Sequence, residues 1–276
     1  MEALELRKED LDKLKFLSKG NEGSVYYYKD YLIKIFKNTY VNDYVYHDTI
    51  IDEDGVKVFN KKNKFTIKKY NAVLKYYDKD GVRMLPEESI KRIIMRQKEI
   101  KGTKLPFNYV KINDKVKGTC IHNYKYTTSI YSSSLLSFRM RLKIMQRLLY
   151  KLKELNDNYI YPADLSSDID NIRNKGNVLL SLKLEPYIID MDGCNVTYLE
   201  KEDEEETKKS INSYSILLME ILSKENLNEL FNECDYEYLK AYTHGIFDDE
   251  FIELFFKEEL TYKYIDKFIK KKLVKE

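Results

Sequence analysis

The chain has 276 residues, a length that suits one large domain or two lobes and excludes a string of modules. Its 48 Lys and Arg residues nearly balance its 46 Asp and Glu residues, so the strong basic excess typical of nucleic-acid-binding proteins is missing. Hydrophobic residues make up 43% of the chain, enough for a buried core, which also excludes an intrinsically disordered chain.

The cysteines and the pattern of apolar residues indicate the cellular compartment of the protein. Cys120, Cys194 and Cys234 have neither metal-ligand nor disulfide spacing, which fits a reducing compartment. The N-terminal segment is too charged for a signal peptide, and no apolar run has the length that a membrane helix needs. We therefore expect a cytoplasmic protein, or one delivered to a host cytosol, with no membrane span and no nucleic-acid partner.

The first part of the chain is predicted to be rich in strands. Residues 5–18 have the composition of a short charged helix or lead-in. Aromatic and β-branched residues over 24–37 predict two strands around a turn at Lys29-Asp30. Residues 38–85 carry only weak strand and turn patterns, and we treat them as an insertion of unassigned structure.

A helix and a second pair of strands follow the insertion. Pro86 suits the first helical position, and the helix is expected to run to about Ile100. Residues 107–128 have the composition of strands around a turn at Lys117-Gly118.

The remainder of the chain is predicted to be mainly helical. From Leu135 onward, apolar residues recur at spacings of three and four, which indicates a helix buried along one stripe. Strand-like segments occupy 178–190, a solvated loop is expected at 200–209, and a strongly apolar helix at 211–223. Two or three amphipathic helices end the chain. Strands followed by helices indicate an α+β protein rather than alternating βαβ units.

Two glycines and a lysine form the first candidate site. Gly20 and Gly23 lie three residues apart at a strand-to-strand turn, where glycine lets backbone N–H groups approach phosphate oxygens. An ordinary hairpin turn explains the same pattern. Lys34 follows within one hairpin, on the apolar strand that also contains Leu32 and Phe36.

Acidic and amide side chains form the second candidate site. Asp164 follows the long buried helix, Asp190 closes an apolar strand, and Asn177 lies thirteen residues before Asp190. Carboxylate and amide oxygens are ligands that hard cations such as Mg²⁺ prefer. Taken singly, each residue is better explained as a helix cap or a turn residue than as a metal ligand.

In this order, these pieces resemble the protein-kinase-like superfamily over roughly residues 10–225. The apolar helix around Asn212 also resembles the kinase helix with the pattern D-x-[WY]-S-x-G-x-x-x-x-E-x-L. The resemblance implies a bilobal fold, an N-lobe over 1–127 and a C-lobe over 128–276, and binding of ATP and Mg²⁺. It implies a catalytic base at Asp164, a phosphate-binding lysine at Lys34, and metal ligands at Asn177 and Asp190. The nucleotide-binding residues that it implies are Ser18, Gly20, Gly23, Val25, Lys34 and Glu87.

Several positions depart from the family pattern. Ser18 stands where the first loop glycine is expected, Pro162-Ala163 replace the catalytic-loop His-Arg, and Ser166 replaces a lysine. Asn212 replaces an aspartate, and no A-P-E motif precedes it. If Asn177 is the metal-binding asparagine, its separation from Asp164 is longer than in the family motif, which implies an insertion between the two residues.

Three assignments keep rivals. Asn171 competes with Asn177 for the metal, and Gln97 and Glu99 compete with Glu87 as the partner of Lys34. A nucleophilic Cys194 is a further alternative, for which the sequence names no base. The lysine-rich C-terminus is expected to be a solvated helix end, with a contact to nucleic acid or anionic lipid as the alternative.

From the resemblance, we expect an ATP-dependent phosphotransferase, in first place a divergent Ser/Thr protein kinase that phosphorylates a hydroxyl group. One alternative is a pseudokinase that binds or scaffolds without turnover, which the lost His-Arg and lysine favour. The other is a small-molecule kinase of the aminoglycoside or choline type, which tolerates a missing A-P-E motif.

Overall fold

In the computed structural model, strands dominate the first part of the chain and helices the second, which confirms the α+β class. The structure describes residues 3–19, 23–36, 49–51, 57–59, 86–97, 100, 103–162, 165, 176–191, 194–196, 204–225 and 236–275, with only the backbone at 49–51, 57–59, 86–89, 115 and 195. Two compact units emerge: Met1–Met95 with Leu105–Asn123, and Arg96–Lys104 with Tyr124–Glu276. The N-lobe and C-lobe identities predicted for 1–127 and 128–276 remain predictions.

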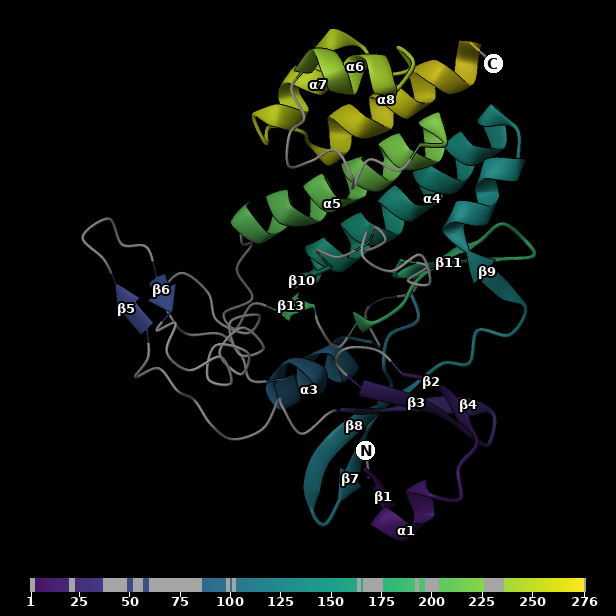
Figure 1. Cartoon of the computed structure of the whole chain (residues 1–276), viewed down its shortest axis with the longest axis vertical. Coiled ribbons are helices and arrows are strands. Elements are labelled where there is room, and N and C mark those ends of the chain that lie inside the picture. The colour runs from purple at the N-terminus through teal and green to yellow at the C-terminus, as the bar shows by residue number, and fades with distance from the viewer. Residues whose placement is uncertain are drawn as a thin grey trace. The chain divides into compact units, whose positions relative to one another are not determined.

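A six-stranded sheet forms the first unit, in the order β1-β7-β8-β4-β3-β2 (Figure 1). All neighbours are antiparallel except β1 and β7, which run parallel. The strands are β1 (Leu4–Leu6), β2 (Phe16–Lys19), β3 (Gly23–Tyr28), β4 (Tyr31–Phe36), β7 (Asn108–Ile112) and β8 (Lys115–Ile121). The same unit contains α1 (Lys8–Leu11), a separate pair of strands β5 (Thr49–Ile51) and β6 (Lys57–Phe59), and most of α3 (Pro86–Arg96). The turn expected at Lys29-Asp30 between β3 and β4 is confirmed.

The N-terminal segment departs from its prediction. Residues 5–18 were expected to be a charged helix or lead-in, but only Lys8–Leu11 are helical, and strands β1 and β2 lie on either side. Leu4 and Leu6 pair with Val110 and Ile112 of β7, about a hundred residues away. Pairing with a strand so distant in sequence overrides local helix propensity, which explains the error.

One face of the sheet carries a compact apolar core. Leu6, Ile33, Val110 and Cys120 are buried together, and Leu11 and Leu14, from α1 and the turn after it, pack against them among other partly buried residues. The N-terminal segment therefore covers this face, while residues of the alternate parity, such as Lys34, face the other side.

A second correction concerns Gly118. The turn between β7 and β8 lies at Asn113-Asp114, both with positive φ, and not at Lys117-Gly118. Gly118 is a strand residue opposite Ile35, and a Cβ added there would lie 2.1 Å from the backbone oxygen of Lys34. A glycine inside a strand here reflects the close approach of two backbones rather than a turn.

The second unit is built on two long helices that lie side by side, α4 (Phe138–Asp157) and α5 (Glu204–Ser223) (Figure 1). The expected buried stripe on α4 is confirmed, since Leu142, Met145, Leu148, Leu149 and Leu152 are all nearly inaccessible. The other elements are β9 (Thr127–Ser129), the 3-10 helix η3 (Ile130–Leu135), β10 (Ile160–Tyr161), β11 (Val178–Ser181), β12 (Pro186–Ile188), β13 (Asn195–Val196), α6 (Tyr236–Tyr242), α7 (Asp249–Phe256) and α8 (Tyr262–Lys275). Among the described helices, none combines the length and apolar character that a bilayer crossing requires.

Two helix boundaries differ from the predictions. Helix α5 begins at Glu204, inside the stretch 200–209 that was expected to be a solvated loop. Glu206 is buried there and accepts a hydrogen bond from Lys209 at 2.9 Å, and the acidic first turn suits the positive end of the helix dipole. Helix α3 ends at Arg96, four residues before the expected Ile100. Arg96 donates to the backbone oxygen of Asn158 at 2.6 Å within the second unit.

The close backbone approach at Gly118 predicts that a larger residue there destabilises the protein. Gly118→Ala should lower the free energy of unfolding by about 1–3 kcal/mol, because the obstructing atom is backbone and β4 must shift to admit a methyl group. Urea unfolding, with hydrogen exchange of the β4 amides, measures the effect. Gly245→Asn is the matched control, since φ there is +66°, nothing lies within 4 Å and Asn tolerates that conformation. Equal unfolding midpoints for the two variants would contradict the close approach.

Candidate functional site

Three predicted nucleotide-binding residues lie in one row across the sheet of the first unit. Ser18 pairs with Val25, and Val25 pairs with Lys34. The row continues to Thr119 on β8, which pairs with Lys34 from the other side. Directly paired residues in a sheet point to the same face, so the register places these four side chains together.

Lys34 is the charged member of this row and is only 6% exposed. Lysines are rarely buried to this degree without a partner for their charge. Lys34 takes part in an interaction within the protein. Its burial distinguishes it from the many solvated lysines of the chain.

Thr119 is a residue of this row that the sequence did not single out. It is fully buried, and its Oγ1 has no hydrogen-bond partner among the described residues. A buried hydroxyl normally has a partner. Because side chains alternate along β8, Thr119 and its neighbour Cys120 point to opposite faces of the sheet. Only the register between β8 and β4 shows that Thr119 lies beside Lys34.

The glycine loop is described only in part. Gly20 lies outside the described residues, whereas Gly23 is buried at the start of β3. A Cβ at Gly23 would lie 2.5 Å from the backbone oxygen of Ile35, so close packing against β4 already requires glycine here. The role of Gly23 in binding phosphate remains a prediction.

The backbone segments that carry two predicted metal ligands of the second unit lie next to each other at one end of a hairpin. Val178 of β11 pairs with Ile188 of β12, and the backbone N–H of Ile189 donates to the backbone oxygen of Asn177 at 2.8 Å. Asp190 comes directly after that contact. Residues thirteen positions apart in the sequence are therefore neighbours in space, and both carry oxygen atoms suited to a hard cation.

The backbone at Asp190 is unusual. Its φ is +62°, a left-handed conformation that Asp and Asn adopt more readily than most residues. The side chain is exposed and has an interaction within the protein. Left-handed backbone at a non-glycine residue is found disproportionately at functional sites.

Several predicted site residues lie outside the described residues. They are Gly20, Asp164, the rival Asn171, the rival Glu99 and the side chain of Glu87. The competing Gln97 is half-buried just after the end of α3. The structure therefore leaves the partner of Lys34 and the position of Asp164 as predictions.

The residue after Asp164 is nevertheless fixed. Leu165 is fully buried, and its backbone N–H donates to Oγ of Ser213 on α5 at 2.9 Å. Asn212, which stands where the family has a helix aspartate, directly precedes Ser213 in α5. The sequence analysis did not single out Ser213, because its contact with Leu165 joins residues 48 positions apart.

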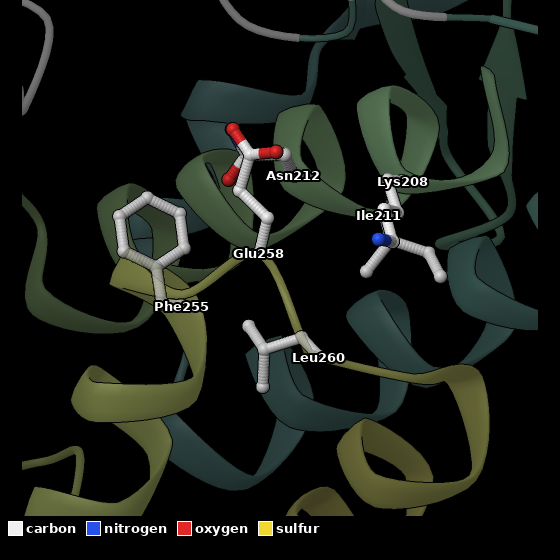
Figure 2. A pocket seen from close by; sticks show the side chains of 6 residues that line it. All are labelled: Lys208, Ile211, Asn212, Phe255, Glu258 and Leu260. Atoms are coloured by element: carbon white, nitrogen blue, oxygen red, sulfur yellow. The ribbon is translucent and has the colours of Figure 1, made fainter. Parts of the chain in front are cut away.

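Asn212 lines a shallow hollow in the second unit, whose empty space of about 170 Å³ includes open solvent. The side chains around it come from α5, from the end of α7 and from the segment joining α7 to α8, as Figure 2 shows: Lys208, Ile211, Asn212, Phe255, Glu258 and Leu260. One lysine and one glutamate, Lys208 and Glu258, are among these residues.

The cysteines offer no activated nucleophile in the described structure. Burial raises the pKa of the Cys120 thiol to about 12, which keeps it protonated at neutral pH. Cys194 is buried, with its sulfur 3.7 Å from that of Met191. Within the described ranges, no three His, Cys, Asp or Glu side chains gather as a metal cluster. The Asn177–Asp190 pair has one carboxylate and belongs to a different class of site.

Comparison with known proteins adds no relative: no protein-family model matches the sequence, and no curated protein matches it either.

The Leu165–Ser213 contact leads to a testable expectation. Ser213→Ala should lower the free energy of unfolding by about 1–3 kcal/mol and speed hydrogen exchange at Leu165, because a buried N–H loses its acceptor. Ser215→Ala is the matched control on the same helix, since its hydroxyl only donates back to Ile211 within α5. Indistinguishable exchange at Leu165 in the two variants would show that Ser213 does not hold the loop.

Proposed function

We propose that the protein is an ATP-dependent phosphotransferase, in first place a divergent Ser/Thr protein kinase. The observation that carries the proposal is the pairing of Asn177 with the segment that ends at Asp190. The kinase resemblance implies a metal-binding amide and a metal-binding carboxylate from separate segments. The backbone hydrogen bond from Ile189, the residue before Asp190, to Asn177 supports this assignment.

The chemistry of this pair fits Mg²⁺. The ion prefers hard oxygen ligands and is usually held by one or two carboxylates, with water and phosphate oxygens in the remaining positions. The carboxylate of Asp190 and the amide oxygen of Asn177 supply such a partial set. When bound, Mg²⁺ would neutralise charge that develops on the transferring phosphoryl group.

The first unit fits a nucleotide. Lys34 lies on the third strand of the β2–β3–β4 meander, as the phosphate-binding lysine of kinases lies on the third strand of theirs. Next to the buried lysine lies the hydroxyl of Thr119, which has no hydrogen-bond partner in the part of the chain that the structure describes, and the two groups are available to a single ligand. Val25, paired with Lys34, adds an apolar side chain on the same face.

The proposal assigns one role in phosphate transfer to each of the candidate site residues. Lys34 binds the α- and β-phosphates, while Asn177 and Asp190 hold the metal. Asp164 orients the attacking hydroxyl and accepts its proton. Ser213 positions the loop that carries Asp164 by holding the neighbouring Leu165. Phosphoryl transfer needs little covalent help from protein, so positioning and charge neutralisation supply most of the rate.

A pseudokinase is the second candidate. Pro162-Ala163 in place of His-Arg and Ser166 in place of lysine remove groups that active kinases use. A scaffold has no need for a buried lysine or for a cation-binding pair, which favours turnover. Nucleotide binding and turnover, measured separately, distinguish the two candidates.

The metal role of Asp190 is tested by Asp190→Asn. Asn tolerates the left-handed backbone, so this change removes the charge while keeping the fold. We expect phosphate transfer from γ-labelled ATP to fall by at least about a hundredfold, and stabilisation by ATP in a thermal-shift assay to lose its dependence on Mg²⁺. Asp114→Asn is the matched control, because Asp114 also has positive φ and lies in the exposed β7–β8 turn.

The outcomes separate the alternatives. Wild-type turnover in Asp190→Asn would remove Asp190 from the metal site. Mg²⁺-dependent ATP binding without turnover in the wild type would favour the pseudokinase. A protein that ATP does not stabilise, with or without Mg²⁺, would contradict nucleotide binding altogether. Incubation with protein and metabolite pools, comparing wild type with Asp164→Ala, identifies the class of acceptor.

A further inference from the structure

Two large apolar side chains project from one end of the three-stranded sheet in the second unit. Ser181 of β11 pairs with Thr127 of β9, so Leu182, which follows Ser181, and Tyr126, which precedes Thr127, lie at adjacent turns. Leu182 is 82% exposed and Tyr126 is 80% exposed. Single exposed apolar residues are common on protein surfaces, but two at neighbouring turns form a feature that calls for an explanation.

Hydrogen bonds hold both turns in place. On the β9 side, the Thr127 hydroxyl donates to the backbone oxygen of Tyr124, whose ring stacks on Tyr187 at 4.8 Å. On the β11 side, the N–H groups of Leu184 and Glu185 donate to the backbone and hydroxyl oxygens of Ser181. The exposed side chains are thus presented by ordered turns rather than by loose chain.

The backbone at Tyr126 supports the same conclusion. Its φ is +57°, a left-handed conformation that is unfavourable for a bulky aromatic residue. Tyr126 is largely exposed, so its ring gains little packing within the protein. A large aromatic side chain that stays exposed at an ordered turn is available to a partner outside the protein.

The charge around the two turns is positive. Lys125 precedes Tyr126 and Lys183 follows Leu182, and both lysines are exposed. The nearby Glu185 is bound by Lys151 at 2.7 Å and approached by Arg147 at 3.7 Å, so its charge is compensated. Two exposed cations and two exposed apolar tips therefore form one surface, which we call the Tyr126–Leu182 edge (residues 125, 126, 182 and 183).

We propose that the Tyr126–Leu182 edge docks on the surface of an anionic lipid bilayer. Leucine and tyrosine suit the boundary between acyl chains and headgroups, and the flanking lysines complement negatively charged headgroups. Projecting tips suit insertion between lipids, whereas recognition of an acidic peptide generally uses a groove or a strand edge that receives it. Four residues give weak, reversible attachment rather than anchoring.

This inference does not rest on the phosphotransferase proposal. Reversible attachment would concentrate the protein at a membrane whatever reaction it catalyses. The lysine-rich end of α8 is the competing surface, because it combines several lysines with the exposed Val274. The experiment must therefore separate the two surfaces within the full chain.

Vesicle flotation with the full-length protein provides the test. Vesicles of phosphatidylcholine with about 30% phosphatidylserine are compared with phosphatidylcholine alone. We expect binding only to the anionic vesicles. The double variant Tyr126→Ser with Leu182→Ser should bind at least about tenfold more weakly, since both inserted side chains are lost. Val274→Ser, an equally exposed apolar position between lysines, is the matched control and should bind like wild type.

Two further variants separate charge from insertion. Lys125→Glu with Lys183→Glu should abolish binding to anionic vesicles, and Tyr126→Trp should strengthen it, because Trp partitions well into the interface. The proposal is overturned if wild type ignores anionic vesicles, if Val274→Ser weakens binding as much as the double variant, or if the edge captures immobilised polyglutamate but not lipid. Circular dichroism of every variant verifies that a loss of binding does not reflect unfolding, and Tyr126→Trp gives a gain that misfolding cannot produce.

Discussion

The backbone hydrogen bond from Ile189 to Asn177 is the contact on which the candidate metal site depends. It extends the β11–β12 ladder by one step beyond Val178 and Ile188. Because ladder geometry fixes which residues face each other, it turns a separation of thirteen residues into adjacency. The amide of Asn177 and the carboxylate of Asp190 are expected to bind Mg²⁺ only together, since a single oxygen ligand from the protein rarely holds the ion.

A similar constraint governs the first unit, where β4 is the central strand. Glycines at its two flanks, Gly23 on β3 and Gly118 on β8, allow both neighbours to approach its backbone closely. Lys34 lies between these close contacts, paired with Val25 on one side and Thr119 on the other. Tight ladders on both sides restrict how the strand can shift, which keeps a buried ammonium group at a defined position.

Helix α5 plays the corresponding part in the second unit. Its Ser213 accepts from the backbone of Leu165, and its Tyr214 donates to the backbone oxygen of Met145 on α4. Arg141 of α4 donates to the carbonyl groups of Ile221 and Leu222, which satisfies oxygens that the end of α5 would otherwise leave unpaired. The loop next to Asp164 is thus attached to a helix that is itself held at several points along its length.

The sequence by itself determined the α+β class, the β3–β4 hairpin and the buried stripe of α4, because alternation and helical periodicity are local signals that the chain expresses directly. Asn177 and Asp190 were also chosen from sequence, through motif order and spacing. Only the tertiary structure decided that residues 4–6 form a strand, that Gly118 lies within a strand, that Thr119 accompanies Lys34 and that Ser213 holds Leu165. Each of these depends on pairing or packing between segments far apart in the chain, and no local pattern encodes register or the rotation of one element against another.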